Sequence, residues 1–157
     1  MLVYEIHTIF EKYKIPYAIV GGYALAFHRI VRATIDVDLV IKLDLETFQK
    51  AEQALESIGL QSRIPVRAKD IIQFRQEYID QRNLIAWSFV DYKNSLRQVD
   101  ILITTDIKSI KVEKISVGGL KMSVISLKDL LRLKKAAGRP QDLRDVEMIE
   151  NKLNEEK

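Results

Sequence analysis

Residues 33–41 place two aspartates, Asp36 and Asp38, two positions apart in an otherwise apolar, β-branched run. Such a run predicts a buried strand, in which residues two apart project from the same face roughly 7 Å from each other. Two ionised carboxylates side by side repel each other and resist desolvation unless solvent or a cation compensates them. Mg²⁺, which takes one or two carboxylates together with substrate phosphates, is a natural partner. For an isolated pair, capping of loop N–H groups at a strand end is the favoured alternative, so the neighbouring features decide.

A third acid lies alone in a later apolar run. Asp100 falls within residues 97–103, where Val99 and Ile101 point to the opposite face of the predicted strand. If this strand pairs beside residues 33–41, three carboxylates meet at one edge of the sheet. Such a cluster suits a two-metal site, in which ions about 3.5–4 Å apart share a carboxylate. The candidate catalytic and metal-binding residues are therefore Asp36, Asp38 and Asp100.

A strand–glycine–glycine–helix step precedes the two aspartates. Residues 17–20 predict a buried strand, Gly21 and Gly22 follow, and residues 23–28 predict a short alanine-rich helix. Paired glycines let the backbone turn sharply and approach a ligand, and free N–H groups at a helix start attract anions such as phosphate. Because glycine pairs mark ordinary turns more often than phosphate sites, this step matters mainly through its nearness to the acids.

Two arginines, Arg29 and Arg32, lie in the connection between that helix and Asp36. Arginine serves phosphate and carboxylate partners equally well. Two roles for Arg32 therefore stay open: it neutralises phosphates, or it pairs with a nearby carboxylate and holds it in place.

The remaining segments predict a mixed α/β chain. Helical spacing covers residues 2–14 and 45–58, and Ser126 and Pro140 open two C-terminal helices separated by Gly138. Alternation of helices and strands favours an α/β sheet within a single domain over residues 1–157. In the middle of the chain we expect a short helix or loop at 70–74, a strand at 84–90, a turn at 94–95 and a short helix at 107–110. After these we expect a hairpin of 112–117 and 120–124 around a purely structural Gly118–Gly119. The tail at 151–157 is expected to fray.

Composition removes several function classes. The chain has no cysteine and two histidines, which excludes disulfides and thiolate sites and disfavours a multi-histidine zinc site. No apolar run approaches the roughly 18 residues that span a bilayer, and the N-terminus lacks the pattern of a signal peptide. We therefore expect a cytoplasmic protein with no membrane partner. The net charge of +3 permits contact with nucleic acid or phosphate without requiring it.

Together these blocks resemble the nucleotidyltransferase superfamily, which has the DNA polymerase β-like fold. Residues 20–28 with Gly21-Gly22, residues 32–39 with Asp36-x-Asp38, and the distant Asp100 match its three motifs. More narrowly, they are similar to bacterial minimal nucleotidyltransferases related to abortive-infection type IV toxin–antitoxin toxins, and residues 133–145 resemble their closing helical pair. The resemblance implies an α/β (α+β) fold, with a mixed sheet flanked by helices and a C-terminal helical pair.

The resemblance also implies a chemistry. Asp36 and Asp38 would coordinate two Mg²⁺ ions, and Asp100 would hold the catalytic metal and help activate an acceptor hydroxyl. The reaction would be in-line attack of that hydroxyl on the α-phosphate of a nucleoside triphosphate (NTP), such as ATP, with loss of pyrophosphate. Residues matching the nucleotide-binding segments are Gly21, Gly22, Tyr23, Arg32, Thr34 and Lys134, of which Lys134 would reach the triphosphate.

The sequence departs from the superfamily pattern at Tyr23. Many active members have a phosphate-binding serine there, so this contact is missing here or made by backbone. His28 is expected to pack or donate at a helix end, and Asp142 and Asp145 to cap and form salt bridges. Two functions are therefore expected. The first is a Mg²⁺-dependent nucleotidyltransferase that acts on RNA, a protein side chain or a small molecule. The second is a non-catalytic protein that binds a partner, such as the cognate antitoxin of a toxin–antitoxin pair. A nucleic-acid-binding module without chemistry is the weakest alternative.

Overall fold

The strands form one seven-stranded mixed sheet in the order β3-β4-β5-β2-β1-β7-β6. The structure is a computed structural model that describes residues 1–156. In the sheet, β2 runs parallel to β5 and β1 parallel to β7, and the other neighbours are antiparallel. The strands are β1 (Ala18–Val20), β2 (Val37–Val40), β3 (Gln61–Ser62), β4 (Ala86–Asp91), β5 (Asn94–Leu102), β6 (Val112–Val117) and β7 (Leu120–Ile125).

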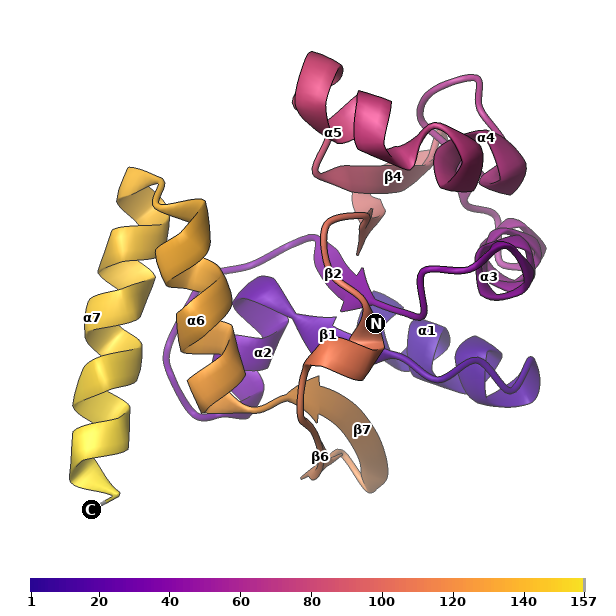
Figure 1. The fold of residues 1–157 in the computed structure, drawn as a ribbon. Helices are drawn as coiled ribbons and strands as arrows, with labels where there is room; N and C mark the ends of the chain where they lie inside the picture. The colour runs from indigo at the N-terminus through magenta and orange to yellow at the C-terminus, as the bar shows by residue number, and fades with distance from the viewer. Residues whose placement is uncertain (157) are drawn as a thin grey trace.

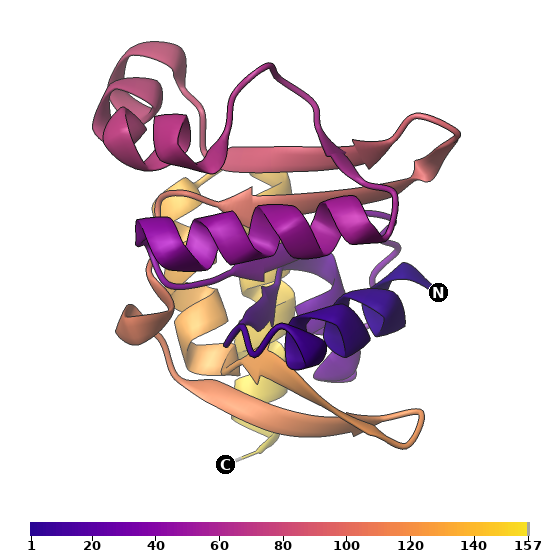
Figure 2. The same cartoon turned by 90° about the vertical axis from the view of Figure 1, so that its right-hand side faces the viewer.

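Helices cover both faces of this sheet. The pair α1 and α3 lies on one face, and α2 with the C-terminal pair α6 and α7 lies on the other (Figures 1 and 2). The predicted mixed α/β architecture with a C-terminal helical pair is confirmed. The helices are α1 (Leu2–Lys12), α2 (Gly21–Phe27), α3 (Leu45–Ser57), α4 (Ala68–Gln73), α5 (Arg75–Arg82), the 3₁₀ turn η1 (Ile107–Ser109), α6 (Leu127–Ala137) and α7 (Pro140–Glu155).

The core between the sheet and α3 determines which way the strand residues point. Phe48 of α3 stacks on Trp87 of β4 at 6.0 Å between ring centroids, and both side chains are fully buried. Burying a large apolar side chain contributes about 1.5–3 kcal/mol relative to leaving it exposed. Val99 and Leu39 are also fully buried. Because side chains alternate along a strand, the residues next to them on β2, β4 and β5 project from the opposite face, toward α6.

Several local predictions are wrong at the level of boundaries. The turn expected at 94–95 lies at residues 92–93, and Asn94 already pairs with Asp91 in the β4–β5 hairpin. Residues 75–82, for which no element was predicted, form the helix α5. The tail expected to fray from residue 151 is helical to Glu155, because Ile149 is fully buried and Leu153 packs on the core. Lys157, the end of that tail, lies outside the described residues.

The hairpin of β6 and β7 forms as predicted around Gly118 and Gly119, and Ser126 accepts the N–H of Asp129 as the N-cap of α6. None of the helices in residues 1–156 combines the length and the apolar character that crossing a bilayer would require.

Candidate active site

Asp38 and Asp100 are register partners on adjacent parallel strands. The β2–β5 ladder pairs Asp38 with Asp100, and the β4–β5 ladder pairs Ser88 with Asp100. Neighbouring strands are about 4.8 Å apart, so these three side chains form a row on the sheet face opposite α3. We call Asp38 and Asp100 the acid pair. Sequence reasoning expected Asp100 beside the doublet, and the sheet register brings it there.

The acid pair is electrostatically strained in the absence of a cation. The pKa of the Asp38 carboxyl is raised to about 7, first by burial and then by the charge of Asp100, a hydrogen bond between the two carboxyl groups and the charge of Asp36, while Lys134 lowers it. Burial and the charge of Asp100 also raise the pKa of Asp36, while Arg63 lowers it. A divalent cation would relieve this repulsion, so the residues present fit the metal that the fold implies.

Asp36 lies outside the strand that carries Asp38. It precedes β2 in a bend and is only half-buried, so the strand predicted over residues 33–41 is shorter than expected. Within residues 1–156, no group of three or more His, Cys, Asp or Glu side chains has an arrangement that would hold a metal ion. Since Mg²⁺ typically takes one or two carboxylates plus substrate phosphates, the acid pair is a sufficient protein contribution.

Gly21 and Gly22 leave room for Asp38 of β2 and for Thr34 in the loop that precedes β2. Gly21 has a φ of +68°, and a Cβ there would overlap Asp38 Oδ2 and lie 2.9 Å from Asp38 Cγ. A Cβ at Gly22 would lie 2.5 Å from Thr34 Oγ1, and that hydroxyl donates to the carbonyl of Asp36 at 3.4 Å. The two glycines therefore let α2 begin directly against Asp38 and Thr34, and Thr34 helps to shape the loop before the acids.

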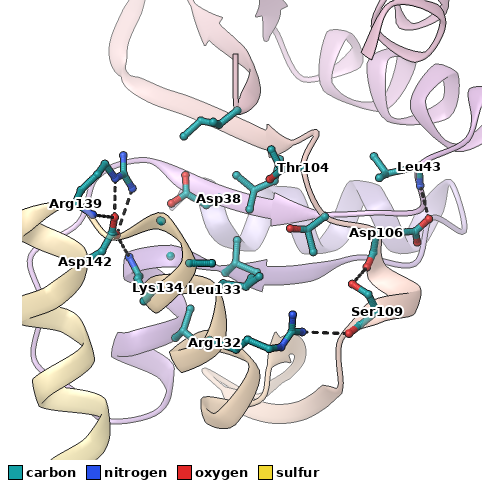
Figure 3. A pocket seen from close by; sticks show the side chains of 18 of the residues that line it. Asp38, Leu43, Thr104, Asp106, Ser109, Arg132, Leu133, Lys134, Arg139 and Asp142 are labelled. Atoms are coloured by element: carbon teal, nitrogen blue, oxygen red, sulfur yellow. Dashed lines mark hydrogen bonds and ion pairs between the residues drawn. The ribbon is translucent and has the colours of Figure 1, made fainter. Parts of the chain in front are cut away.

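A cavity of about 650 Å³ opens between the sheet and the C-terminal helices, with Asp38 and Gly21 in its wall (Figure 3). Its size is within the range of small-molecule and cofactor sites. Four basic side chains from α5, α6 and the α6–α7 turn also line it: Arg75, Arg132, Lys134 and Arg139. The cavity thus combines the Asp38 carboxylate on the sheet with cations opposite, the charge pattern that a metal-bound polyphosphate needs. Asp36 and Asp100 are not among the residues that line it.

The basic residues nearest Asp38 belong to a network of charges between α6, α7 and the loop before β2, in which the carboxylates are buried and Arg139 is largely exposed. Lys134 Nζ lies 3.4 Å from Asp142 Oδ1 and 3.0 Å from Asp145 Oδ2, and Arg139 Nε donates to Asp142 Oδ2 at 2.7 Å. Asp142 and Asp145 are each 1% exposed. The predicted salt bridges are confirmed for both aspartates, and the predicted capping is confirmed for Asp142, which also accepts the backbone N–H of Arg139.

Arg32 takes the second of its two predicted roles. Its Nη1 lies 3.6 Å from Asp145 Oδ1, so it holds a carboxylate of α7 and none of the three candidate acids. Tyr23 packs beside Phe27 at 5.9 Å between centroids and is not among the residues that line the cavity. His28 Nε2 bonds with the carbonyl of Ile125 at 2.7 Å, in keeping with the predicted packing or hydrogen-bonding role.

Removing Asp145 should destabilise the protein strongly. The Asp145→Ala variant leaves Arg32 and Lys134, whose side chains are 18% and 13% exposed, without their shared carboxylate. Breaking a buried pair by deleting one partner costs about 3–5 kcal/mol. We expect a loss of about 3 kcal/mol in the free energy of unfolding, measured by urea denaturation.

Glu150→Ala is the matched control, because Glu150 also joins α7 to α6, through Lys135 at 3.1 Å, but both side chains are about half exposed. Exposed pairs contribute at most about 1 kcal/mol. Equal losses for the two variants would contradict the description of a buried network.

The raised pKa of Asp38 predicts how the stability of the metal-free protein changes with pH. A carboxyl whose pKa rises on folding stabilises the folded state below its unfolded pKa, near 3.8, and that contribution is lost as the pH rises toward about 7. In EDTA, wild-type stability should fall by a few kcal/mol more than that of Asp38→Asn between pH 4 and pH 8. Urea denaturation of both proteins at the two pH values measures the difference, and parallel pH profiles would refute it.

Sequence reasoning missed several residues of this region. Arg75, Arg132 and Arg139 reach the cavity through helix packing, which no local spacing reveals. Gln98 is different, because it lies two positions before Asp100 in the same strand and therefore shares its face. That period of two, applied to the residues around Asp100, was a signal that could have identified it.

No protein-family model matches the chain, and no curated protein matches it by sequence. Solved structures do match by fold. ANT(2'')-Ia in complex with adenylyl-2''-tobramycin matches with a TM-score of 0.66 at 13% identity, over 97% of this chain and 87% of that one. LnuA, a lincosamide antibiotic adenylyltransferase in its lincomycin-bound form, matches with 0.63 at 14%, over 94% of both chains. An antigenic nucleotidyltransferase-like protein from Paracoccidioides brasiliensis matches with 0.54 at 18%, over 94% of this chain and 72% of that one. The chain therefore has a nucleotidyltransferase-like fold.

Proposed function

We propose that the protein transfers a nucleotide from an NTP to an acceptor hydroxyl. The observation that supports this most directly is the register pairing of Asp38 with Asp100, beside a cavity lined by basic side chains. The fold similarity to two antibiotic adenylyltransferases points the same way. In this proposal Asp38 and Asp100 would hold a shared Mg²⁺ together with substrate phosphates, with Asp36 at the edge of the site. The bound metal would supply Lewis-acid stabilisation of the charge on the reacting phosphates.

The protein's own groups then have defined tasks. Lys134 and Arg139 neutralise the triphosphate. Gly21 and Gly22 let the start of α2 lie against Asp38 and Thr34, so that its first backbone N–H groups receive the terminal phosphates. The acceptor oxygen forms a bond to the α-phosphorus while the bond from that phosphorus to the bridging oxygen breaks. Pyrophosphate leaves with the electron pair, and Asp100 accepts the proton of the attacking hydroxyl. Thr34 and Arg32 act indirectly, by shaping the loop that leads to the acids, and Tyr23 offers only its backbone.

The proposal is tested by label transfer. The purified protein is incubated with each of the four α-labelled NTPs and Mg²⁺, against total RNA, lysate protein, tobramycin or lincomycin. We expect labelled product with at least one acceptor and none in EDTA. The acceptor that takes the label identifies the substrate class.

The alternative is a non-catalytic protein that keeps the fold and acts through a partner, such as a cognate antitoxin. The replacement of the phosphate-binding serine by Tyr23, which packs on Phe27, is the observation that favours it. Stabilisation by Mg²⁺ and NTP in a thermal melt, without label on any acceptor, would support this alternative over catalysis.

A further inference from the structure

One oxygen of Asp100 receives two hydrogen bonds from neighbouring side chains. Ser88 Oγ donates to Asp100 Oδ1 at 2.6 Å, and Gln98 Nε2 donates to the same oxygen at 3.0 Å. Two donors on Oδ1 hold that oxygen in place and so restrict the rotation of the carboxylate. Neither donor contacts the second oxygen, Oδ2, and the carboxyl group of Asp38 is within hydrogen-bonding reach of the Asp100 carboxyl group.

The donor group of Gln98 is itself held in place. Arg63 Nη2 donates to Gln98 Oε1 at 2.7 Å, so the amide carbonyl faces Arg63 and the amide N–H₂ faces Asp100. The backbone N–H of Arg63 also bonds to the carbonyl of Ser88 at 2.9 Å. Arg63, which follows the edge strand β3, therefore contacts both of the residues that donate to Asp100.

These contacts are poorly suited to a purely structural role. Gln98 and Asp100 belong to the same strand, so the bond between their side chains joins no two elements. The β4–β5 hairpin is already paired through its backbone over most of its length, including the Ser88–Asp100 position. The side chains face away from the apolar core that packs under α3. What the contacts do fix is the orientation of one carboxylate.

We infer that Ser88 and Gln98 are positioning residues that aim Asp100 at the cation of the acid pair, and that Arg63 acts through Gln98. This inference rests on the proposed function, because it assumes that Asp38 and Asp100 share a divalent cation. Like charges on the acid pair favour a rotation of Asp100 away from Asp38, and the two donors on Oδ1 oppose it. Residues that orient a metal ligand in this way are typically worth 10–100-fold in metal affinity.

The test is direct binding of Mn²⁺ to the full chain, followed by the electron paramagnetic resonance signal of the free ion. Gln98→Ala and Ser88→Ala should each weaken Mn²⁺ binding about tenfold or more. Ser88→Thr, which keeps the hydroxyl and suits a strand, should bind like wild type. Gln61→Ala is the control, since Gln61 is an exposed glutamine on the neighbouring strand β3. Thermal melts of each variant verify that it is folded.

Two double variants separate positioning from a general effect on the sheet. Adding Gln98→Ala to Asp100→Asn should change Mn²⁺ binding no further, because the carboxylate that Gln98 aims is gone. Adding Arg63→Ala to Gln98→Ala should likewise equal Gln98→Ala alone. Additive losses in either pair, or wild-type Mn²⁺ binding by Gln98→Ala, would overturn the inference. Wild-type Mn²⁺ binding that survives Asp38→Asn would instead overturn the metal site of the proposed function.

Discussion

Replacing Asp38 with asparagine should lower the rate of nucleotide transfer by about 10³-fold or more while leaving the protein folded. Asparagine keeps the shape of the side chain but removes the charge that would hold a cation between β2 and β5. Metal ions stabilise the transition state by several kcal/mol, and each 1.4 kcal/mol corresponds to a factor of ten in rate. The measurement is the initial rate of label transfer with saturating NTP and Mg²⁺.

The half-buried position of Asp38 beside Asp100 sharpens this expectation. In the metal-free protein the carboxyl is strained by burial and by Asp100, so its neutral replacement should not destabilise the fold at pH 8. A loss of activity together with unchanged or increased stability separates a role in chemistry from a role in folding. Asp38→Asn with more than a tenth of the wild-type rate would remove the catalytic assignment.

Replacing Gly21 with alanine should reduce both stability and activity. The residue has a φ of +68°, and its new methyl group would meet Asp38 Oδ2 and Cγ. A left-handed conformation costs a non-glycine residue about 1–2 kcal/mol, and overpacking adds about 1–3 kcal/mol. Because Asp38 must move, we expect the transfer rate to fall about 100-fold, the effect of a displacement near 1 Å.

Gly59→Ala is the matched control for this variant. Gly59 has a φ of +87°, but nothing lies within 4 Å of the position that its Cβ would take. It should therefore lose the backbone contribution of about 1–2 kcal/mol and retain full activity. Equal activity of the two alanine variants would contradict the close approach of α2 to the acid strand. Urea denaturation and the transfer assay together give the comparison.

The sequence predicted the elements of this site better than its surroundings. The apolar alternation around Asp38 and Asp100 follows from the strand period of two, and a mixed sheet with Asp38 and Asp100 as neighbours was expected before the structure. The glycine step at Gly21 was predicted for its backbone freedom, and the structure adds a steric reason, the nearness of Asp38 Oδ2. Local sequence pattern was sufficient to predict the position of a residue where that position depends only on its own strand or turn.

Sequence pattern did not predict those residues whose role depends on contacts between distant parts of the chain. Arg75 and Arg139 line the cavity because of how the helices pack, which residue spacing in the sequence does not indicate. Arg63 bonds to Gln98, which is 35 positions away in the sequence. The helix α5 was missed because its sequence is strongly polar and it buries no residue completely, so no apolar stripe marks it. All of the site residues stay predictions as regards metal and nucleotide binding: Asp36, Asp38, Asp100, Gly21, Gly22, Tyr23, Arg32, Thr34 and Lys134.

The central claim is that Asp38 and Asp100 together hold a divalent cation for nucleotide transfer. Its most direct test is a crystal structure with Mn²⁺ and a non-cleavable NTP analogue, in which anomalous scattering locates the metal. We predict an anomalous peak about 2.1 Å from a carboxylate oxygen of each residue, with phosphate oxygens completing the coordination. A saturated crystal with the metal bound elsewhere, or with the analogue bound away from the acid pair, would contradict the account.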